Sequence, residues 1–199
     1  MAITMGKGNK LAIQKDNGIN KAHFGLNWDV RKIPGPDYDL DFFFVLVGAD
    51  GRAAYGDNNN SLVFYNRKEL PNKSVYVLED NRTGADTGSG PGYYDEQGFI
   101  VFKDVPAEVK EIIAAVSIYE YDVRRQNFGQ VNNAKFDILN GETNTVIATG
   151  DLSEDMANYT GIICCRFRRE ADGNWSVKSV MEPVSNGMAG IIAQFGMSA

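Results

Sequence analysis

The sequence predicts a mainly β protein, an antiparallel β-sandwich with two short helices, one of which lies at the C-terminus. Roughly ten short apolar or alternating segments are separated by turns roughly every eight to twelve residues, a pattern typical of sandwich folds. The 21 glycines fit a chain that turns often. A β-barrel is the alternative arrangement of the same strands. A length of 199 residues suits one domain with a sizeable core, so we expect a single domain over residues 1–199.

The strand signals begin in the N-terminal half. Residues 21–29 alternate so that Phe24, Leu26 and Trp28 share one side, which we expect to face the core. Clusters of glycine, proline and asparagine separate this segment from the next ones. The other strands expected in this half are 3–14, as an opening hairpin, 42–47, 62–65 and 74–78.

The C-terminal half combines strands with the two helix signals. A short helix is expected over residues 104–111, because an aspartate in the capping position comes shortly before a proline. Ser185 can cap a second helix over residues 187–195, with Gly196 as its stop. The strands expected in this half are 99–102, 112–119, 134–139, 146–148, 162–168 and 174–180.

Composition and charge exclude several function classes. A net charge of −6 and a pI near 4.9 argue against general affinity for nucleic acid or for an anionic membrane surface, since both require a basic face. No apolar run is long enough to span a bilayer, and residues 1–14 contain none of signal-peptide length. We therefore expect a cytoplasmic protein that does not insert into membranes, with cations as its favoured ligands.

The cysteine and histidine content offers little catalytic chemistry. Cys164 and Cys165 are adjacent, so on a regular strand they point to opposite faces, and we expect reduced thiols. His23 is the single histidine, and every triad or histidine-based zinc site would have to include it. No cofactor fingerprint accompanies it. We expect no enzymatic activity.

An acidic, glycine-rich stretch over residues 79–96 is the strongest candidate site. It holds five carboxylates and one arginine, Arg82, which we expect to pair with a carboxylate. Such a loop is commonly only solvated. Its ligands, however, are all oxygens, without a nearby histidine or cysteine, and flexible oxygen ligands suit Ca²⁺ better than the stricter octahedral Mg²⁺.

A second acidic segment lies upstream of this loop. Asp37, Asp39 and Asp41 alternate at period two, which places all three carboxylates on one face of an extended segment. Such a face requires a counter-charge, and the strand and the loop are expected to converge on one or two calcium ions. Arg124 and Arg125 are expected to form a surface network with nearby acidic residues, Glu120 and Asp122, and the alternative is that they bind an anionic partner.

Several sequence blocks, in this order, resemble the TerD family. The blocks are residues 25–29, 37–41, 64–66, 80–84, 95–96, 126–131, 151–155 and 194–196, so that the resemblance covers nearly the full chain. The resemblance implies a calcium-binding β-sandwich, without catalysis, from a family associated with tellurite resistance, bacterial stress response and phage defence. The metal ligands that it implies by position are Asp29, Asp39, Asp41, Asp80, Asn81, Thr83, Asp86, Asp95 and Glu96.

Two departures from the family pattern leave two functions open. Phe42, Phe43 and Phe44 stand where small residues are usual, and Tyr93 and Tyr94 stand where further carboxylates are common. The first hypothesis is a calcium-binding stress protein that acts through metal-dependent association with a protein partner or with itself. The alternative is a calcium-stabilised structural subunit of a larger assembly, such as a phage virion. Burial of these aromatic side chains between protomers would favour the assembly.

Overall fold

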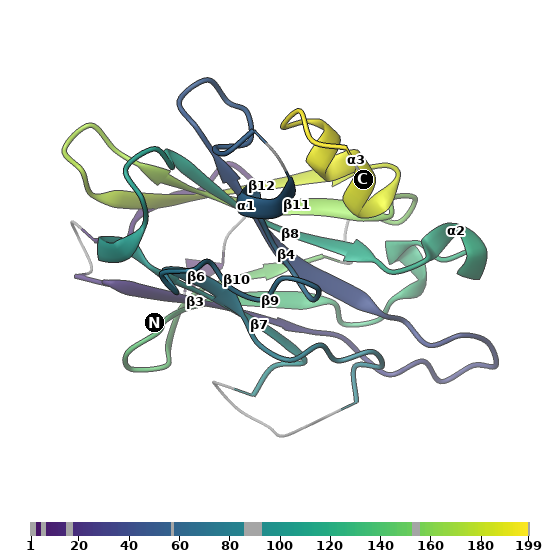
Figure 1. Ribbon diagram of the computed structural model, residues 1–199. Coiled ribbons are helices and arrows are strands. Elements are labelled where there is room, and N and C mark those ends of the chain that lie inside the picture. Colours follow the sequence, from purple (N-terminus) through teal and green to yellow (C-terminus); the bar gives the residue numbers. More distant parts are fainter. Residues whose placement is uncertain are drawn as a thin grey trace.

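The computed structural model describes residues 3–4, 7–14, 18–56, 58–85, 93–152 and 156–198. Within these ranges, the strands form two six-stranded sheets that stack as the two layers of a sandwich (Figure 1). The predicted fold class is confirmed, including a short helix near the C-terminus. No helix within the same ranges is long and apolar enough to cross a membrane.

Each sheet mixes strands from both halves of the chain. The first sheet contains, in spatial order, β1 (Ile3–Thr4), β10 (Thr145–Asp151), β9 (Lys135–Asn140), β3 (Lys21–Asn27), β7 (Glu96–Val101) and β6 (Val75–Val77). The second contains β2 (Lys10–Ala12), β12 (Trp175–Val184), β11 (Gly161–Arg169), β8 (Glu111–Ile118), β4 (Leu40–Val47) and β5 (Leu62–Val63). All neighbouring strands pair antiparallel except β1 and β10, which are parallel.

Strand β4 supplies apolar side chains to both faces of the second sheet. Phe42 and Phe44 enter the core between the sheets, where the Phe42 ring stacks on Phe24 with a centroid distance of 4.3 Å. Phe43 lies on the opposite face, in a second apolar cluster that the helix α3 (Gly187–Ala193) covers. Burying each of these rings stabilises the fold by about 1.5–3 kcal/mol. The phenylalanines therefore pack within the chain.

The helix expected over residues 104–111 is absent. The structure has a 3-10 turn at Phe102–Asp104, and the chain then enters β8 at Glu111. Phe102 is buried and stacks on Trp175 with a centroid distance of 5.4 Å, while Glu111 pairs with Val47 of β4. Core packing and strand pairing thus override the capping signal.

Two further helices are short. Helix α1 spans Asn58–Ser61, and helix α2 spans Tyr121–Arg124, in a segment that the sequence predicts as a polar loop. The residues flanking α2, Glu120 and Arg125, have φ values of 48° and 52°. These left-handed conformations are not visible as a sequence pattern, because neither residue is glycine.

The prediction that Cys164 and Cys165 point to opposite faces is wrong. The pairing of β11 with β8 shifts register between Ile163 and Cys165, which makes residue 164 the extra residue of a β-bulge against β8. Against β12 the register also shifts at this level, but there the extra residue lies on β12. Both cysteines are free thiols, and both side chains are buried in the core between the sheets.

Candidate metal centre

Three carboxylates from two distant segments meet at the end of β4. Asp39 precedes the strand, Asp41 is its second residue, and Asp80 belongs to the loop after β6. One oxygen of each lies within 4.8 Å of an oxygen of the others. Asp39 and Asp41 are buried, and the Asp80 side chain is 19% exposed. The segments that the sequence analysis expected to converge do so.

These residues line a cavity of about 320 Å³. The residues around it are Pro36, Asp37, Asp39, Asp41, Tyr65, Asp80, Arg82, Thr83, Tyr119 and Arg124. Asp37, Asp39 and Asp41 all contribute, as their period-two spacing predicted. The same alternation that sends Phe42 into the core keeps Asp41 on the other side of the strand.

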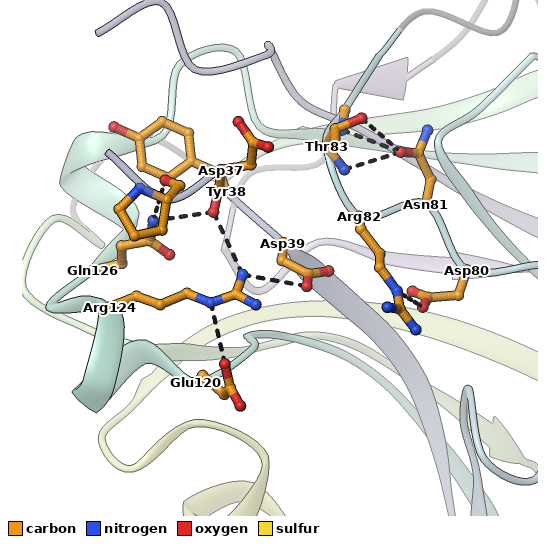
Figure 2. A network of polar contacts seen from close by, with 12 residues as sticks. Asp37, Tyr38, Asp39, Asp80, Asn81, Arg82, Thr83, Glu120, Arg124 and Gln126 are labelled. Carbon is orange, nitrogen blue, oxygen red and sulfur yellow. Dashed lines mark hydrogen bonds and ion pairs between the residues drawn. The ribbon is translucent and has the colours of Figure 1, made fainter. Parts of the chain in front are cut away.

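Two arginines supply positive charge at the cavity (Figure 2). Arg82 Nε lies 3.1 Å from Asp80 Oδ2, so the expected pairing of Arg82 with a carboxylate is confirmed. Arg124 Nη1 lies 3.3 Å from Asp39 Oδ2, and its Nε lies 3.4 Å from Glu120 Oε2. The expected contact with Glu120 is present, but Arg124 also reaches a buried carboxylate that the sequence analysis did not assign to it.

Two carboxyl groups of the cavity, those of Asp39 and Asp41, resist ionisation. Burial, together with the nearby charges of Asp39 and Asp80, raises the pKa of Asp41 to about 8. Burial also raises the pKa of Asp39, while Arg124 acts in the opposite direction. A cation bound between these groups would lower both pKa values, because opposite charge favours the ionised form.

Glu96 lies beside this group on β7. Its carboxylate accepts a hydrogen bond from the backbone N–H of Phe42. This N–H lies on the edge of β4 that pairs with β5, and β5 pairs only with Phe44 and Val45. Burial raises the pKa of Glu96 well above its ordinary value, and the charges of Asp41 and Asp80 act in the same direction. Glu96 thus completes an acidic interior around Asp41.

The geometry and donor set fit a calcium ion. Two oxygens bound to the same Ca²⁺ at about 2.4 Å are at most about 4.8 Å apart, which matches the spread of the three carboxylates. Asp80 Oδ1 is buried and receives no hydrogen bond from a described amide, hydroxyl or basic group, and Asp80 shares a hydrogen bond with another acid, the side chain of Glu96. Asp39, Asp41 and Asp80 are the residues that would hold the ion, and its charge would satisfy this oxygen.

Asn81 and Asp95 belong to a different network. Asn81 Oδ1 accepts hydrogen bonds from the N–H groups of Thr83 at 3.1 Å and Gly84 at 3.2 Å. Asn81 Nδ2 donates to Asp95 Oδ1 at 2.8 Å, and Asp95 Oδ2 accepts from the Trp28 N–H at 3.1 Å. These groups fix the shape of the loop and attach it to the end of β3, while Thr83 also lines the cavity.

Gly84 is required where this loop crosses Trp28. Its φ is +65°, and an added Cβ would lie 2.5 Å from Trp28 Nε1. That indole N–H in turn donates to the carbonyl oxygen of Tyr38 at 2.9 Å, just before the acidic residues of β4. The loop and the strand are therefore positioned against one tryptophan.

Of the two remaining predicted ligands, Asp29 does not join the three carboxylates. Asp29 Oδ2 accepts a hydrogen bond from Asn133 Nδ2 at 2.9 Å and lies 3.9 Å from Lys32 Nζ. Asp86 lies outside the described residues.

Sequence reasoning missed two cavity residues, Tyr65 and Tyr119, and it also missed that Arg124 points into the cavity. The Tyr119 N–H donates to the Asp39 carbonyl oxygen at 2.8 Å, continuing the pairing of β8 with β4. Knowledge of that strand pairing would place Tyr119 opposite Asp39, but the sequence alone does not reveal which strands pair.

The fold and cavity define a β-sandwich protein with an enclosed group of carboxylates at one end. The TerD domain matches residues 1–195, and the chain belongs to the TerD family. General stress protein 16U of Bacillus subtilis is 36% identical, covering 99% of this chain and 98% of its own. Tellurium resistance protein TerD of Serratia marcescens is 33% identical, covering 100% of both chains. The crystal structure of SAV2460, a protein of unknown function, is similar in fold, with a TM-score of 0.75 at 21% identity, covering 92% of this chain and 100% of that chain.

Proposed function

We propose that this protein is a non-enzymatic calcium-binding protein of the TerD type, which acts in stress response or tellurium resistance through metal-dependent association with a protein partner or with itself. The names of its relatives, a general stress protein and a tellurium resistance protein, support the biological setting. The convergence of Asp39, Asp41 and Asp80 within 4.8 Å carries the calcium assignment.

Without a bound cation, the carboxylates of the cavity repel one another, and this repulsion is unfavourable. Three carboxylates are held together by β4 and by a loop whose shape a separate hydrogen-bond network fixes. A rigid group of acidic oxygens gains more from a divalent ion than a flexible surface loop does, because the loop must first be ordered. Calcium bound to the folded state at a hundredfold excess over Kd would stabilise it by about 2.7 kcal/mol.

The single histidine supports a role without catalysis. His23 is 2% exposed, stacks on Phe99 with a centroid distance of 4.3 Å and contacts the Tyr94 ring edge-on at 5.5 Å. It does not line the acidic cavity. Burial lowers its pKa to about 4, so it is neutral near pH 7. Saturable hydrolytic turnover that His23→Ala abolishes would contradict this part of the proposal.

Calcium titration of the wild type and two aspartate variants tests the metal assignment. Isothermal calorimetry and native mass spectrometry, with and without chelator, should show bound calcium in the wild type and its loss in Asp80→Asn. Asp29→Asn is the matched control, because it removes the same charge from a carboxylate that bonds to Asn133. A wild type that binds no calcium overturns the assignment, as does equal weakening by Asp29→Asn and Asp80→Asn.

A double-mutant cycle tests whether Asp39 and Asp80 bind the same ion. At saturating calcium, Asp39→Asn should already remove most of the calcium-dependent stabilisation, so that adding Asp80→Asn costs much less than it does alone. Losses that add within about 0.5 kcal/mol would instead mean two independent sites.

A further inference from the structure

Arg124 occupies a fixed position at the cavity. Its side chain is 20% exposed, and Nη1 contacts Asp39 Oδ2 at 3.3 Å and the carbonyl oxygen of Asp37 at 3.5 Å. Its guanidinium lies over the Tyr119 ring, 5.1 Å from the centroid, and its Nε lies 3.4 Å from Glu120. Figure 2 shows the side chain reaching from α2 toward Asp39. The contacts leave the guanidinium little freedom.

The backbone around Arg124 is held in an unusual conformation. Glu120 before α2 and Arg125 after it both have left-handed φ values, of 48° and 52°. Such conformations cost non-glycine residues energy and persist only where the surroundings enforce them. Here Gln126 Nε2 donates to the carbonyl oxygens of Pro36 at 2.9 Å and Asp37 at 3.1 Å. The turn is therefore tied to the segment that carries Asp39.

A bound calcium ion and this guanidinium would both interact with the Asp39 carboxylate. Calcium held by Asp39, Asp41 and Asp80 would lie next to the Asp39 carboxylate that Arg124 contacts, and two positive charges at that separation repel strongly in a partly buried cavity. Arg82 differs, because its side chain is 78% exposed and moves into solvent easily. Arg124 is the cation that the fold places inside the site.

We infer that Arg124 is a tethered counter-cation that competes with calcium for Asp39, so that calcium binding releases its guanidinium from the cavity. The inference rests on the proposed calcium site and adds its regulation. Without the ion, Arg124 partly neutralises the carboxylates and preserves the loop and strand geometry. Because the two cations oppose each other, a stronger Arg124–Asp39 pair means weaker calcium binding.

Calcium titration of Arg124→Gln against Arg125→Gln tests this competition. Both substitutions remove one positive charge from the same turn, but Arg125 is exposed and does not line the cavity. Arg124→Gln should bind calcium roughly tenfold more tightly than the wild type, whereas Arg125→Gln should stay within about twofold. In chelator, Arg124→Gln should melt roughly 2–4 °C lower, because Asp39 loses its partner.

Two further measurements separate competition from a structural role. Arg124→Lys keeps the charge and should restore affinity toward that of the wild type. In the wild type, the Arg124 Nε–H NMR signal should shift and exchange faster with water as calcium is added. A structural role alone predicts lower stability with equal or weaker calcium affinity in Arg124→Gln, and no calcium-dependent change in the Nε–H signal.

The outcomes distinguish failure of the inference from failure of the proposed site. If the wild type binds calcium and Arg124→Gln binds it no more tightly than Arg125→Gln, competition is overturned and the site stands. If neither the wild type nor Arg124→Gln binds calcium, both are overturned. If only Arg124→Gln binds calcium, competition is supported, while the proposed calcium-binding function of the wild type is overturned.

Discussion

Asp80 and Asp95 belong to the same acidic stretch, yet the structure gives them opposite situations. Asp95 is 8% exposed, and its two oxygens accept hydrogen bonds from Asn81 and from the Trp28 N–H. Asp80 pairs through one oxygen with the exposed Arg82, and its other neighbours are acids: it shares a hydrogen bond with Glu96 and lies close to Asp39 and Asp41. A carboxylate that accepts hydrogen bonds from amide groups stabilises a loop, whereas one surrounded by other acids gains from an added cation.

The largest expected effect on stability comes from removing Asp95, the carboxylate that accepts hydrogen bonds from the loop and from Trp28. Asp95→Ala should lower the free energy of unfolding by about 3 kcal/mol, because it leaves the Trp28 N–H and Asn81 Nδ2 without their charged acceptor. The loss should appear in urea titrations performed in chelator. Asp29→Ala, which removes a half-exposed acceptor, should cost less than about 1 kcal/mol. An Asp95→Ala protein as stable as Asp29→Ala in chelator would contradict the assignment.

The pH dependence of stability tests the buried carboxyl groups of the cavity. In chelator, the unfolding free energy should fall as pH rises from about 4 toward about 8, because unfolded Asp41 ionises near its ordinary pKa while folded Asp41 keeps its proton until about pH 8. One group contributes at most about 1.4 kcal/mol per pH unit. Asp39 and Glu96, whose pKa values are also raised, act in the same direction.

Asp41→Asn should therefore reduce this slope without abolishing it. Denaturant titrations at several pH values, with and without calcium, measure the effect. Saturating calcium should flatten or reverse the slope in the wild type, because the ion binds the ionised carboxylates and its binding releases protons. Equal slopes for the wild type and Asp41→Asn in chelator would show that Asp41 does not hold a proton near neutral pH.

The smallest expected effect concerns Asp80 without metal. In chelator, Asp80→Asn should change the free energy of unfolding by less than about 1 kcal/mol, since it loses a surface ion pair with Arg82 but also removes repulsion with Asp39 and Asp41. Thermal melts in chelator and in calcium measure both states. A large loss of unfolding free energy in chelator would show that Asp80, like Asp95, stabilises the fold without metal.

The sequence predicts the parts of the site that depend on local periodicity. The alternation of Asp37, Asp39 and Asp41 places them in one cavity, and the apolar run that follows becomes β4. It does not predict how the residues of the acidic loop divide, because the roles of Asn81 and Asp95 depend on contacts with Trp28 across the fold. Local pattern carries no information about such pairings.

The missed features share a non-local cause. The left-handed residues around α2 bring Arg124 to Asp39, and nothing in the order Glu120 to Arg125 signals them. The bulge at Cys164 arises from the pairing of β11 with β8, and the helix expected over 104–111 yields to the packing of Phe102. In each case tertiary contacts decide between local conformations of similar energy.

The aromatic residues that distinguish this chain support the fold instead of an assembly. Phe42, Phe43 and Phe44 are each at most 2% exposed within the chain itself. The Tyr94 ring covers Gly25, and its hydroxyl donates to Asp137 at 2.7 Å. Tyr93, at 57% exposure, remains available for contacts. Burial between protomers, which would have favoured a virion-like subunit, is therefore not found for the three phenylalanines, because they are buried within the chain.

The lengths of the outermost strands affect how copies of this protein meet in a crowded cell. Three of the outermost strands are two or three residues long: β6 in the first sheet, and β2 and β5 in the second. An edge this short offers few backbone donors and acceptors to a strand from another molecule. Sheet extension and amyloid-like stacking are thereby disfavoured, so a protein of this build can reach a high concentration without templating its own aggregation.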